Sequence, residues 1–381
     1  MNNQNKNHIK VYQDNTFKFR EIFNVDTGFY VRGDSIETGK DPFMRSFPSL
    51  LDIGIMGGCK SCKVCTADCY QGGKPYNPDK DMKFEDYKSI IVEGAKKGLQ
   101  QVALGGAGNP NDHKDFDKIV KFTREKGIVP NYTTSGIELT DEAVFFTKKY
   151  CGAVAVSWYY QQFTVDALNK FLNADMKTSI HFVLSKKTID DAINMLEYHK
   201  LPYYENTESS KVYREYSFEE NKINAVIFLL YKPVGRGVYK NVLNINQDNE
   251  KLKRFFNLVS SKQHPFKIGF DSCGVPGVVR YSKDIDLASV DSCEGGRFSA
   301  YINADMIMTP CSFDQELKYG VSLRNSSVEE VWNSDNFTKF RSKLFLSCPN
   351  CQNRDCCMGG CPLKQEVVLC NSGLRDKSLV A

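Results

Sequence analysis

Seven short apolar runs, separated by amphipathic stretches, constrain the fold of this chain more than any other feature. The runs occupy residues 51–55, 102–104, 128–132, 153–157, 180–184, 225–231 and 268–270. Helical spacing of apolar side chains follows the first two runs, at Phe84, Tyr87, Ile91 and Ala95 and again at Phe116, Ile119, Val120 and Thr123. Repeated strand–helix units predict an α/β fold with a parallel sheet, either doubly wound or curled into a full or partial barrel.

The loops after the first three runs are the candidate ligand site, because ligands bind at the carboxyl ends of parallel strands. The first loop carries four cysteines, the second is the glycine-rich stretch 105–110, and the third is the stretch 133–136. Glycine lets backbone approach a ligand, and its N–H groups can bind a carboxylate or a ribose. Each loop alone is typical of an ordinary turn. Three such loops in succession favour a cofactor site.

The cysteines of the first loop, Cys59, Cys62, Cys65 and Cys69, have the spacing of a bacterial ferredoxin run, with Tyr70 in place of the usual proline. Thiolates this close together suit an iron–sulfur cubane. Zinc is the alternative, because four thiolates also satisfy its tetrahedral preference. A position directly after the first strand favours a reactive centre over a structural one.

Composition places these thiols in a reducing compartment. The first residues are polar, and no stretch approaches the ~20 apolar residues of a membrane span, so we expect a cytoplasmic protein. Clustered cysteines there indicate metal binding or redox work. The net charge of +4 is spread along the chain, which argues against nucleic-acid and membrane partners.

A second group of thiols lies near the end of the sequence, at Cys348, Cys351, Cys357, Cys361 and Cys370. With both groups, the chain resembles the radical S-adenosylmethionine superfamily, and in its C-terminal part the subgroup with a SPASM extension. The resemblance implies an N-terminal segment (1–48), a partial (β/α)6 TIM-like barrel (49–270) and a small cysteine-rich SPASM-type domain (271–381). It also implies a [4Fe-4S] cluster on three cysteines, with one iron free for S-adenosylmethionine. Cleavage of that cofactor yields a 5'-deoxyadenosyl radical, which removes hydrogen from a substrate.

The first loop departs from the usual family spacing, because Cys62-x2-Cys65-x3-Cys69 reverses the common order of the two gaps. Which three of the four thiols hold the cluster stays open, and a fourth ligand would close the free iron. Asn109 stands where the family commonly has a glutamate for the cofactor's amino group, and His181 is alternatively a hydrogen-bonded core residue. The cofactor-binding residues that the resemblance implies are Gly105, Gly106, Gly108, Asn109, Ser135, Gly136, Ser157 and His181.

The SPASM resemblance implies two auxiliary [4Fe-4S] clusters, with Met306 at a position that is usually glycine. Auxiliary set I is Cys273, Cys293, Cys311 and Cys361, and auxiliary set II is Cys348, Cys351, Cys357 and Cys370. Cys151 is expected to be a buried apolar thiol and Cys356 to be unligated. A pair of zinc sites is the alternative for the whole region.

Family members with this extension mostly modify peptides or proteins, so the resemblance implies an oxidoreductase of that kind, served by an external donor such as flavodoxin or ferredoxin. Ser312 argues against a sulfatase maturase, in which an aspartate follows the matching cysteine. Asp271 is a candidate proton acceptor, or else a backbone cap.

The segment 1–48 is short for a peptide-clamping domain, and residues 201–222 are expected to be a loop that covers the substrate. Two alternative functions stay open. The chain could carry out the same chemistry on a small metabolite, or it could be a non-catalytic electron carrier with several clusters.

Overall fold

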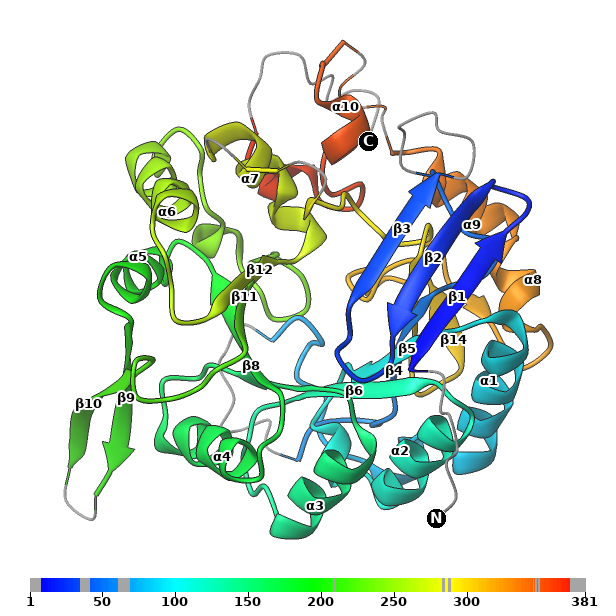
Figure 1. Cartoon of the computed structure of the whole chain (residues 1–381), viewed down its shortest axis with the longest axis horizontal. Coiled ribbons are helices and arrows are strands. Elements are labelled where there is room, and N and C mark those ends of the chain that lie inside the picture. The colour runs from blue at the N-terminus through cyan, green and yellow to red at the C-terminus, as the bar shows by residue number, and fades with distance from the viewer. Residues whose placement is uncertain are drawn as a thin grey trace.

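Ten strands form one sheet around which the chain is built (Figure 1), in the order β12-β11-β8-β7-β6-β5-β4-β13-β14-β15. The computed structural model describes residues 8–34, 42–60, 69–207, 210–282, 285–286, 289–344, 346, 348 and 350–370. Seven of its parallel strands coincide with the seven apolar runs: β4 (Leu50–Gly54), β5 (Gln101–Gly105), β6 (Val129–Thr134), β7 (Val154–Ser157), β8 (Thr178–Leu184), β11 (Ala225–Leu230) and β12 (Lys267–Phe270). The predicted partial barrel is confirmed.

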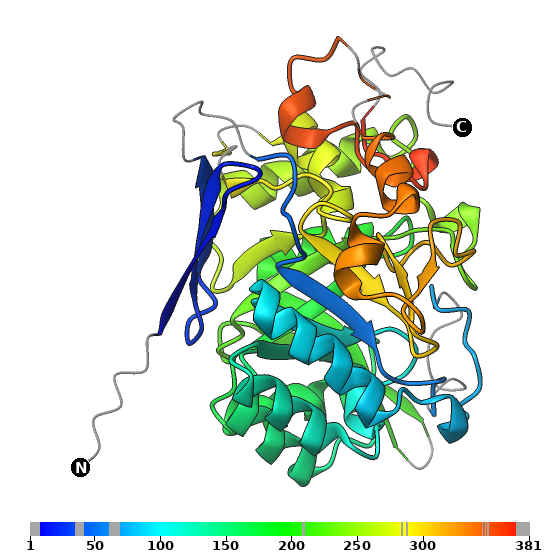
Figure 2. The same cartoon turned by 90° about the vertical axis from the view of Figure 1, so that its right-hand side faces the viewer.

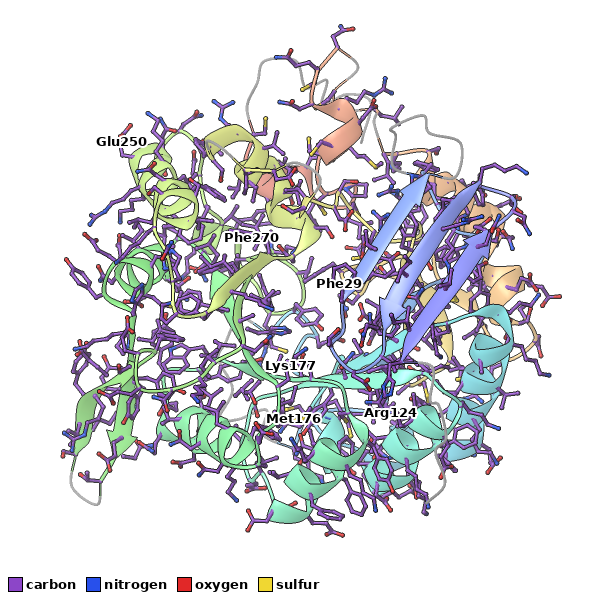
Figure 3. All side chains as sticks on the ribbon, viewed as in Figure 1. Phe29, Arg124, Met176, Lys177, Glu250 and Phe270 are labelled. Carbon is purple, nitrogen blue, oxygen red and sulfur yellow. The ribbon has the colours of Figure 1, made fainter. Side chains whose placement is uncertain are left out.

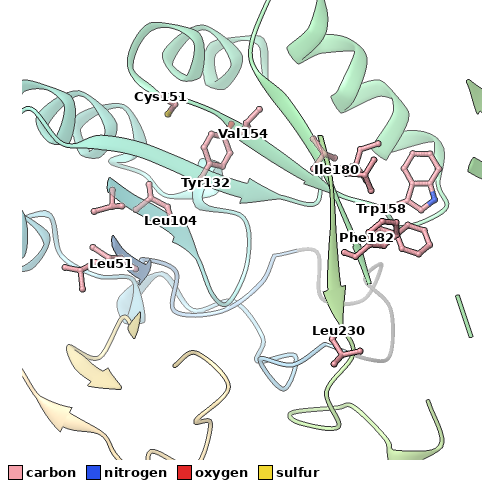
Figure 4. Close-up of a cluster of buried hydrophobic side chains, with 14 of the residues drawn as sticks. Leu51, Leu104, Tyr132, Cys151, Val154, Trp158, Ile180, Phe182 and Leu230 are labelled. Carbon is pink, nitrogen blue, oxygen red and sulfur yellow. The ribbon is translucent and has the colours of Figure 1, made fainter. Parts of the chain in front are cut away.

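Helices alternate with these strands and lie outside the sheet (Figure 1): α1 (Phe84–Lys97), α2 (Phe116–Glu125), α3 (Asp141–Tyr150), α4 (Gln162–Asn173), α5 (Ile189–Tyr198), α6 (Asn249–Ser261) and α7 (Val275–Tyr281). All four apolar positions predicted on α2 are buried. The outward side chains of the strands form the core against the helices (Figure 4), among them Leu51, Leu104, Ile180 and Phe182. Cys151 lies in this core with 6 % of its surface exposed, as expected of an apolar thiol.

The C-terminal part continues the same sheet. Strand β13 (Ser299–Ile302) pairs parallel to β4, and β14 (Ile307–Thr309) and β15 (Val321–Ser322) follow as antiparallel strands. Met306 takes a φ of +64° in the turn between β13 and β14. This left-handed conformation is one that glycine adopts more easily than a residue with a side chain. The helices α8 (Val328–Trp332), α9 (Asp335–Arg341) and α10 (Arg354–Cys357) come after the sheet. Strand β13 lies after the predicted domain boundary at residue 270 but pairs with the barrel sheet. That boundary stays a prediction.

The N-terminal segment forms a separate antiparallel sheet of β1 (Ile9–Asp14), β2 (Phe19–Asn24) and β3 (Tyr30–Asp34). It contacts the amino ends of the barrel strands. Gln100, just before β5, donates a 2.7 Å hydrogen bond to Glu21 of β2. The ammonium of Lys177, labelled in Figure 3, donates to the carbonyl of Thr27 in the β2–β3 turn. Figure 2 shows this sheet at one end of the barrel and the segment 69–80 at the other.

The stretch 201–222 is not the loop that the sequence indicated. It contains the hairpin of β9 (Lys200–Asn206) and β10 (Lys211–Ser217). In this hairpin, only the paired residues Leu201 and Tyr216 have buried side chains, and the paired tyrosines Tyr204 and Tyr213 are exposed. The alternation of apolar and polar residues that marks a strand is therefore weak in this stretch of sequence. A covering role for this hairpin stays a prediction. Across the described ranges, every helix is too short or too polar to cross a membrane.

Candidate functional site

The inner face of the barrel sheet carries small and polar side chains. In β8, Ile180, Phe182 and Leu184 are buried against helices, so alternation turns Ser179, His181 and Val183 inward. Val183 is 45 % exposed although it lies in a central strand. The inner face is therefore accessible near the carboxyl end of this strand.

His181 lies on this inner face, where the Thr133 hydroxyl and His181 Nδ1 are 3.4 Å apart. Burial lowers the pKa of His181 to about 4, opposed in part by the charge of Asp271, so the imidazole is neutral at pH 7. Ser157 ends the neighbouring strand β7 and pairs with His181 in the sheet. A cofactor contact by either residue stays a prediction.

The glycine-rich loop after β5 packs directly on the cysteine loop after β4. Gly106 and Gly108 have φ of +88° and +78°, which side chains disfavour. A Cβ atom on Gly108 would lie 2.5 Å from the carbonyl oxygen of Gly58, next to Cys59. Glycine is thus required there for the close approach of the two loops.

Asn109 joins the second loop to the third. It is 4 % exposed, and its Oδ1 accepts a 2.8 Å hydrogen bond from the backbone N–H of Ser135. Its Nδ2 donates to Oδ2 of Asp112 at 3.3 Å. Gly136 then turns the chain away with a φ of +83°.

Asp112 is a site residue that the sequence did not single out. Burial raises the pKa of its carboxyl, against the charge of Lys60 and the hydrogen bond from Asn109. Its place three residues after Asn109 was the only signal in the sequence. A carboxylate therefore lies directly beside Asn109.

The cysteine loop is described at its two ends, and Cys62 and Cys65 lie outside the described residues. The Cys59 amide donates to the Lys74 carbonyl at 3.0 Å, and residue 59 forms an isolated bridge with Pro75. The carbonyl of Cys69 accepts a 2.9 Å hydrogen bond from the amide of Arg236, in the turn after β11. Both described cysteines are partly exposed.

Auxiliary set I comes together between the barrel and the C-terminal part. The thiols of Cys273 and Cys361 are hydrogen-bonded, and this contact together with burial raises the pKa of Cys273 well above its usual value. Burial raises the pKa of Cys293 to about 12, with a further contribution from Cys273. Burial and the neighbouring Cys293 and Cys273 likewise raise the pKa of Cys311. The four predicted members are therefore neighbours.

Auxiliary set II also gathers in space. Burial raises the pKa of Cys357 to about 11, and the nearby Cys348, Cys370 and Cys351 contribute to the shift. The pKa of Cys356, one residue earlier, is raised by burial and by the charge of Asp291. The ligand roles of both sets stay predictions.

The chemistry of these thiols suits a cluster of cationic irons. Burial raises the pKa of Cys293, Cys311 and Cys357, and the contact with Cys361 together with burial raises the pKa of Cys273. These neutral thiols resist ionisation, and a bound metal would relieve that cost because it holds thiolates outright. Within the described ranges, no three His, Cys, Asp or Glu side chains are placed to hold a single metal ion.

The carboxylate of Asp271, a candidate proton acceptor, is occupied by structural contacts. It follows β12, and its Oδ1 accepts hydrogen bonds from the amides of Leu230 and Gly274 at 3.1 and 3.2 Å. Its Oδ2 lies 2.6 Å from the ammonium of Lys232. These contacts favour the capping interpretation, and a catalytic role stays a prediction.

Residues 293–357 match the family model SPASM, described as an iron–sulfur cluster-binding domain. The fold is similar to that of Streptococcus suis SuiB bound to S-adenosylmethionine, with a TM-score of 0.70, 14 % identity, and coverage of 97 % of this chain and 99 % of SuiB. SuiB bound to the precursor peptide SuiA gives 0.69 and 14 %, with 98 % of both chains covered. The enzyme anSMEcpe with bound AdoMet gives 0.59 and 14 %, covering 86 % of this chain and 92 % of that one. No curated protein matches the sequence.

Proposed function

We propose that this chain, which carries an iron–sulfur cluster-binding SPASM domain on the fold of the radical S-adenosylmethionine enzymes, reductively cleaves S-adenosylmethionine and abstracts hydrogen from a peptide or protein side chain. One observation carries the proposal. The loops after β4, β5 and β6 interlock at one end of the barrel, through Gly108 on Gly58 and through Asn109 on Ser135. Cys59 therefore lies beside the loops that we propose to bind the cofactor.

In this proposal three of the thiols Cys59, Cys62, Cys65 and Cys69 hold a [4Fe-4S] cluster, which supplies the electron for cleavage when it is reduced. Asn109 and Asp112 would accept the cofactor's ammonium group. Asn109 Oδ1 keeps a second lone pair after bonding Ser135, and the Asp112 carboxylate adds the negative charge that strengthens such a bond. The other expected contacts are Gly105, Gly106, Gly108, Ser135, Gly136, Ser157 and His181.

Auxiliary sets I and II would hold two further clusters that receive or deliver electrons, with a flavodoxin- or ferredoxin-like protein as the external donor. The cytoplasm, which keeps thiols reduced, is the proposed location.

A peptide substrate is supported by two observations. The inner face of the barrel is accessible at Val183, beside the proposed cofactor contacts. Structures similar to this fold include SuiB with its precursor peptide and anSMEcpe with the Kp18Cys peptide. Ser312 after Cys311 points away from the sulfatase-maturase reaction.

The test is cofactor cleavage. Anaerobically reconstituted protein, given dithionite and S-adenosylmethionine, should produce 5'-deoxyadenosine and contain about twelve iron and twelve sulfide ions per chain. A full iron content without 5'-deoxyadenosine would instead identify an electron carrier. Zinc in place of iron would overturn the assignment of clusters. Peptide modification is then tested by mass spectrometry with candidate peptides encoded beside the gene.

A further inference from the structure

We infer that the buried ammonium of Lys232 is a positioning charge that raises the reduction potential of the cluster held by auxiliary set I. The inference rests on the proposed function only for the presence of that cluster. Lys232 follows β11, and its side chain is 0 % exposed. A lysine is almost never fully buried unless it is paired with an opposite charge, and here the partner is Asp271.

The contacts of Lys232 place its charge between the two cysteine-bearing regions. Its Nζ donates to the Leu230 carbonyl at 2.9 Å and to Oδ2 of Asp271 at 2.6 Å. The same atom lies 4.1 Å from the centre of the Phe313 ring. Asp271 is two residues before Cys273, and Phe313 is two residues after Cys311.

Phe313 extends this group to the first cysteine loop. Its ring centre is 4.9 Å from that of Tyr70, which directly follows Cys69. The ammonium therefore lies at the junction where the cysteine loop after β4 meets auxiliary set I.

The charge is retained in this buried position. Burial disfavours the ammonium, but Asp271 and the nearby thiols of Cys273 and Cys361 raise the pKa of Lys232 above its usual value. Its partner Asp271 is two residues before Cys273, so the ammonium is a fixed positive charge beside auxiliary set I.

The sign of the effect on a cluster follows from Coulomb's law. One-electron reduction adds one negative charge to the cluster and its thiolates, and a fixed ammonium in a poorly solvated site stabilises that state. Asp271 acts in the opposite direction. Removing Lys232 should therefore favour the oxidised cluster, and neutralising Asp271 should favour the reduced one.

The experiment is an EPR-monitored redox titration of the reconstituted full-length chain with Cys59, Cys62, Cys65 and Cys69 replaced by alanine, so that only the auxiliary clusters contribute. In the Lys232→Met variant, the ratio of reduced to oxidised cluster at a fixed potential should fall about tenfold for one cluster and stay constant for the other. In Asp271→Asn the same ratio should rise. The double variant should lie between the two, and Lys232→Arg should behave like the parent.

A matched control is Lys251→Met, because Lys251 forms a 2.7 Å pair with Asp190 on the surface. It should leave both potentials unchanged. Loosening of the protein around the cluster would shift the reduction potential in the same direction in both variants. Opposite shifts in Lys232→Met and Asp271→Asn therefore cannot arise from loosening alone.

Unchanged potentials, or shifts of one sign in both variants, would overturn the inference. If wild-type protein still forms 5'-deoxyadenosine in that case, the proposed function survives. If the auxiliary potentials shift as expected but no cofactor is cleaved, the inference stands and the proposed reaction fails. Protein that binds no iron would overturn both.

Discussion

The two ends of the barrel are built in opposite ways. At the amino ends of the strands, the N-terminal sheet is joined to the barrel by buried charged groups. At the carboxyl ends of β4 to β6, loops meet through glycines and through the buried amide of Asn109, and the two described cysteines of the cysteine loop are partly exposed. We therefore expect the first end to contribute mainly to stability and the second to contain the proposed ligand site.

The amino end is held by Arg45 and Glu21, both with fully buried side chains 3.1 Å apart. Arg45 also donates to the carbonyls of Pro48 and Gly98, each at 2.9 Å, and stacks 3.6 Å above the Tyr12 ring. Glu21 accepts from Tyr30 and Gln100, each at 2.7 Å. A buried ion pair stabilises only when its remaining hydrogen bonds are made. Most of them are made here, whereas Arg45 Nε, which faces Glu21, makes no hydrogen bond.

The carboxyl ends of β11 and β12 carry a buried pair of their own, Lys232 and Asp271, but the loops after β4 and β5 are built differently. Cys59 and Cys69 are partly exposed, and Gly106 and Gly108 take backbone conformations that a side chain would strain. Because the buried charged network and the proposed ligand contacts lie at different ends, substitutions should separate stability from activity.

The largest effect should come from the cysteine loop. Alanine at Cys59, Cys62, Cys65 and Cys69, one at a time, should reduce 5'-deoxyadenosine formation by ~10³-fold or more for three of them, because each removes a cluster ligand. The fourth variant should keep activity. The unfolding free energy of the metal-free protein should change by less than about 1 kcal/mol, since the two described cysteines are partly exposed.

Four inactive variants would show a closed cluster and remove the free iron from the proposal. Four active ones would move the reactive centre away from this end of the barrel.

Arg45→Met should cause the largest loss of stability, about 3 kcal/mol, because it leaves the Glu21 carboxylate buried without its counter-charge. Urea unfolding of the metal-free chain measures this. Binding of S-adenosylmethionine to the reconstituted protein should be unchanged.

The matched control is Lys97→Met, which removes the exposed pair between Lys97 and Glu329 and should cost less than about 1 kcal/mol. Equal losses in the two variants would contradict the stabilising role of the amino end.

Asn109→Ala should weaken S-adenosylmethionine binding about tenfold, since it leaves the Ser135 amide and Asp112 without their partner. Isothermal titration of the reconstituted protein measures the change. Asn109→Asp keeps an acceptor for Ser135 and should bind within about threefold of wild type. An unchanged affinity in Asn109→Ala would show that this loop does not contact the cofactor.

The sequence predicted the strands and the site loops because their signals are local. Barrel strands bury one face against helices, so the seven apolar runs coincide with strands, and the loops that follow them meet by topology. The β9–β10 hairpin was missed because its tyrosines are exposed, and β2 was hidden by Glu21, a charged residue buried between Phe19 and Phe23. Asp112 and Lys232 were not predicted because their roles depend on contacts between loops that sequence spacing does not encode.

The smallest effect should come from pH and His181. The pKa of His181 lies at about 4 in the folded protein, below the ordinary value of 6.5, because burial disfavours the imidazolium. As pH falls from 7 to 5, the unfolded chain takes up this proton and the folded chain does not, so stability decreases. Because the inner face is partly solvated, we expect about 1 kcal/mol. The His181→Gln variant should lose correspondingly less stability over this range, measured by urea unfolding at pH 7 and pH 5. Equal losses in both proteins would place His181 in solvent and would extend the open, ligand-accessible end of the barrel to the middle of β8.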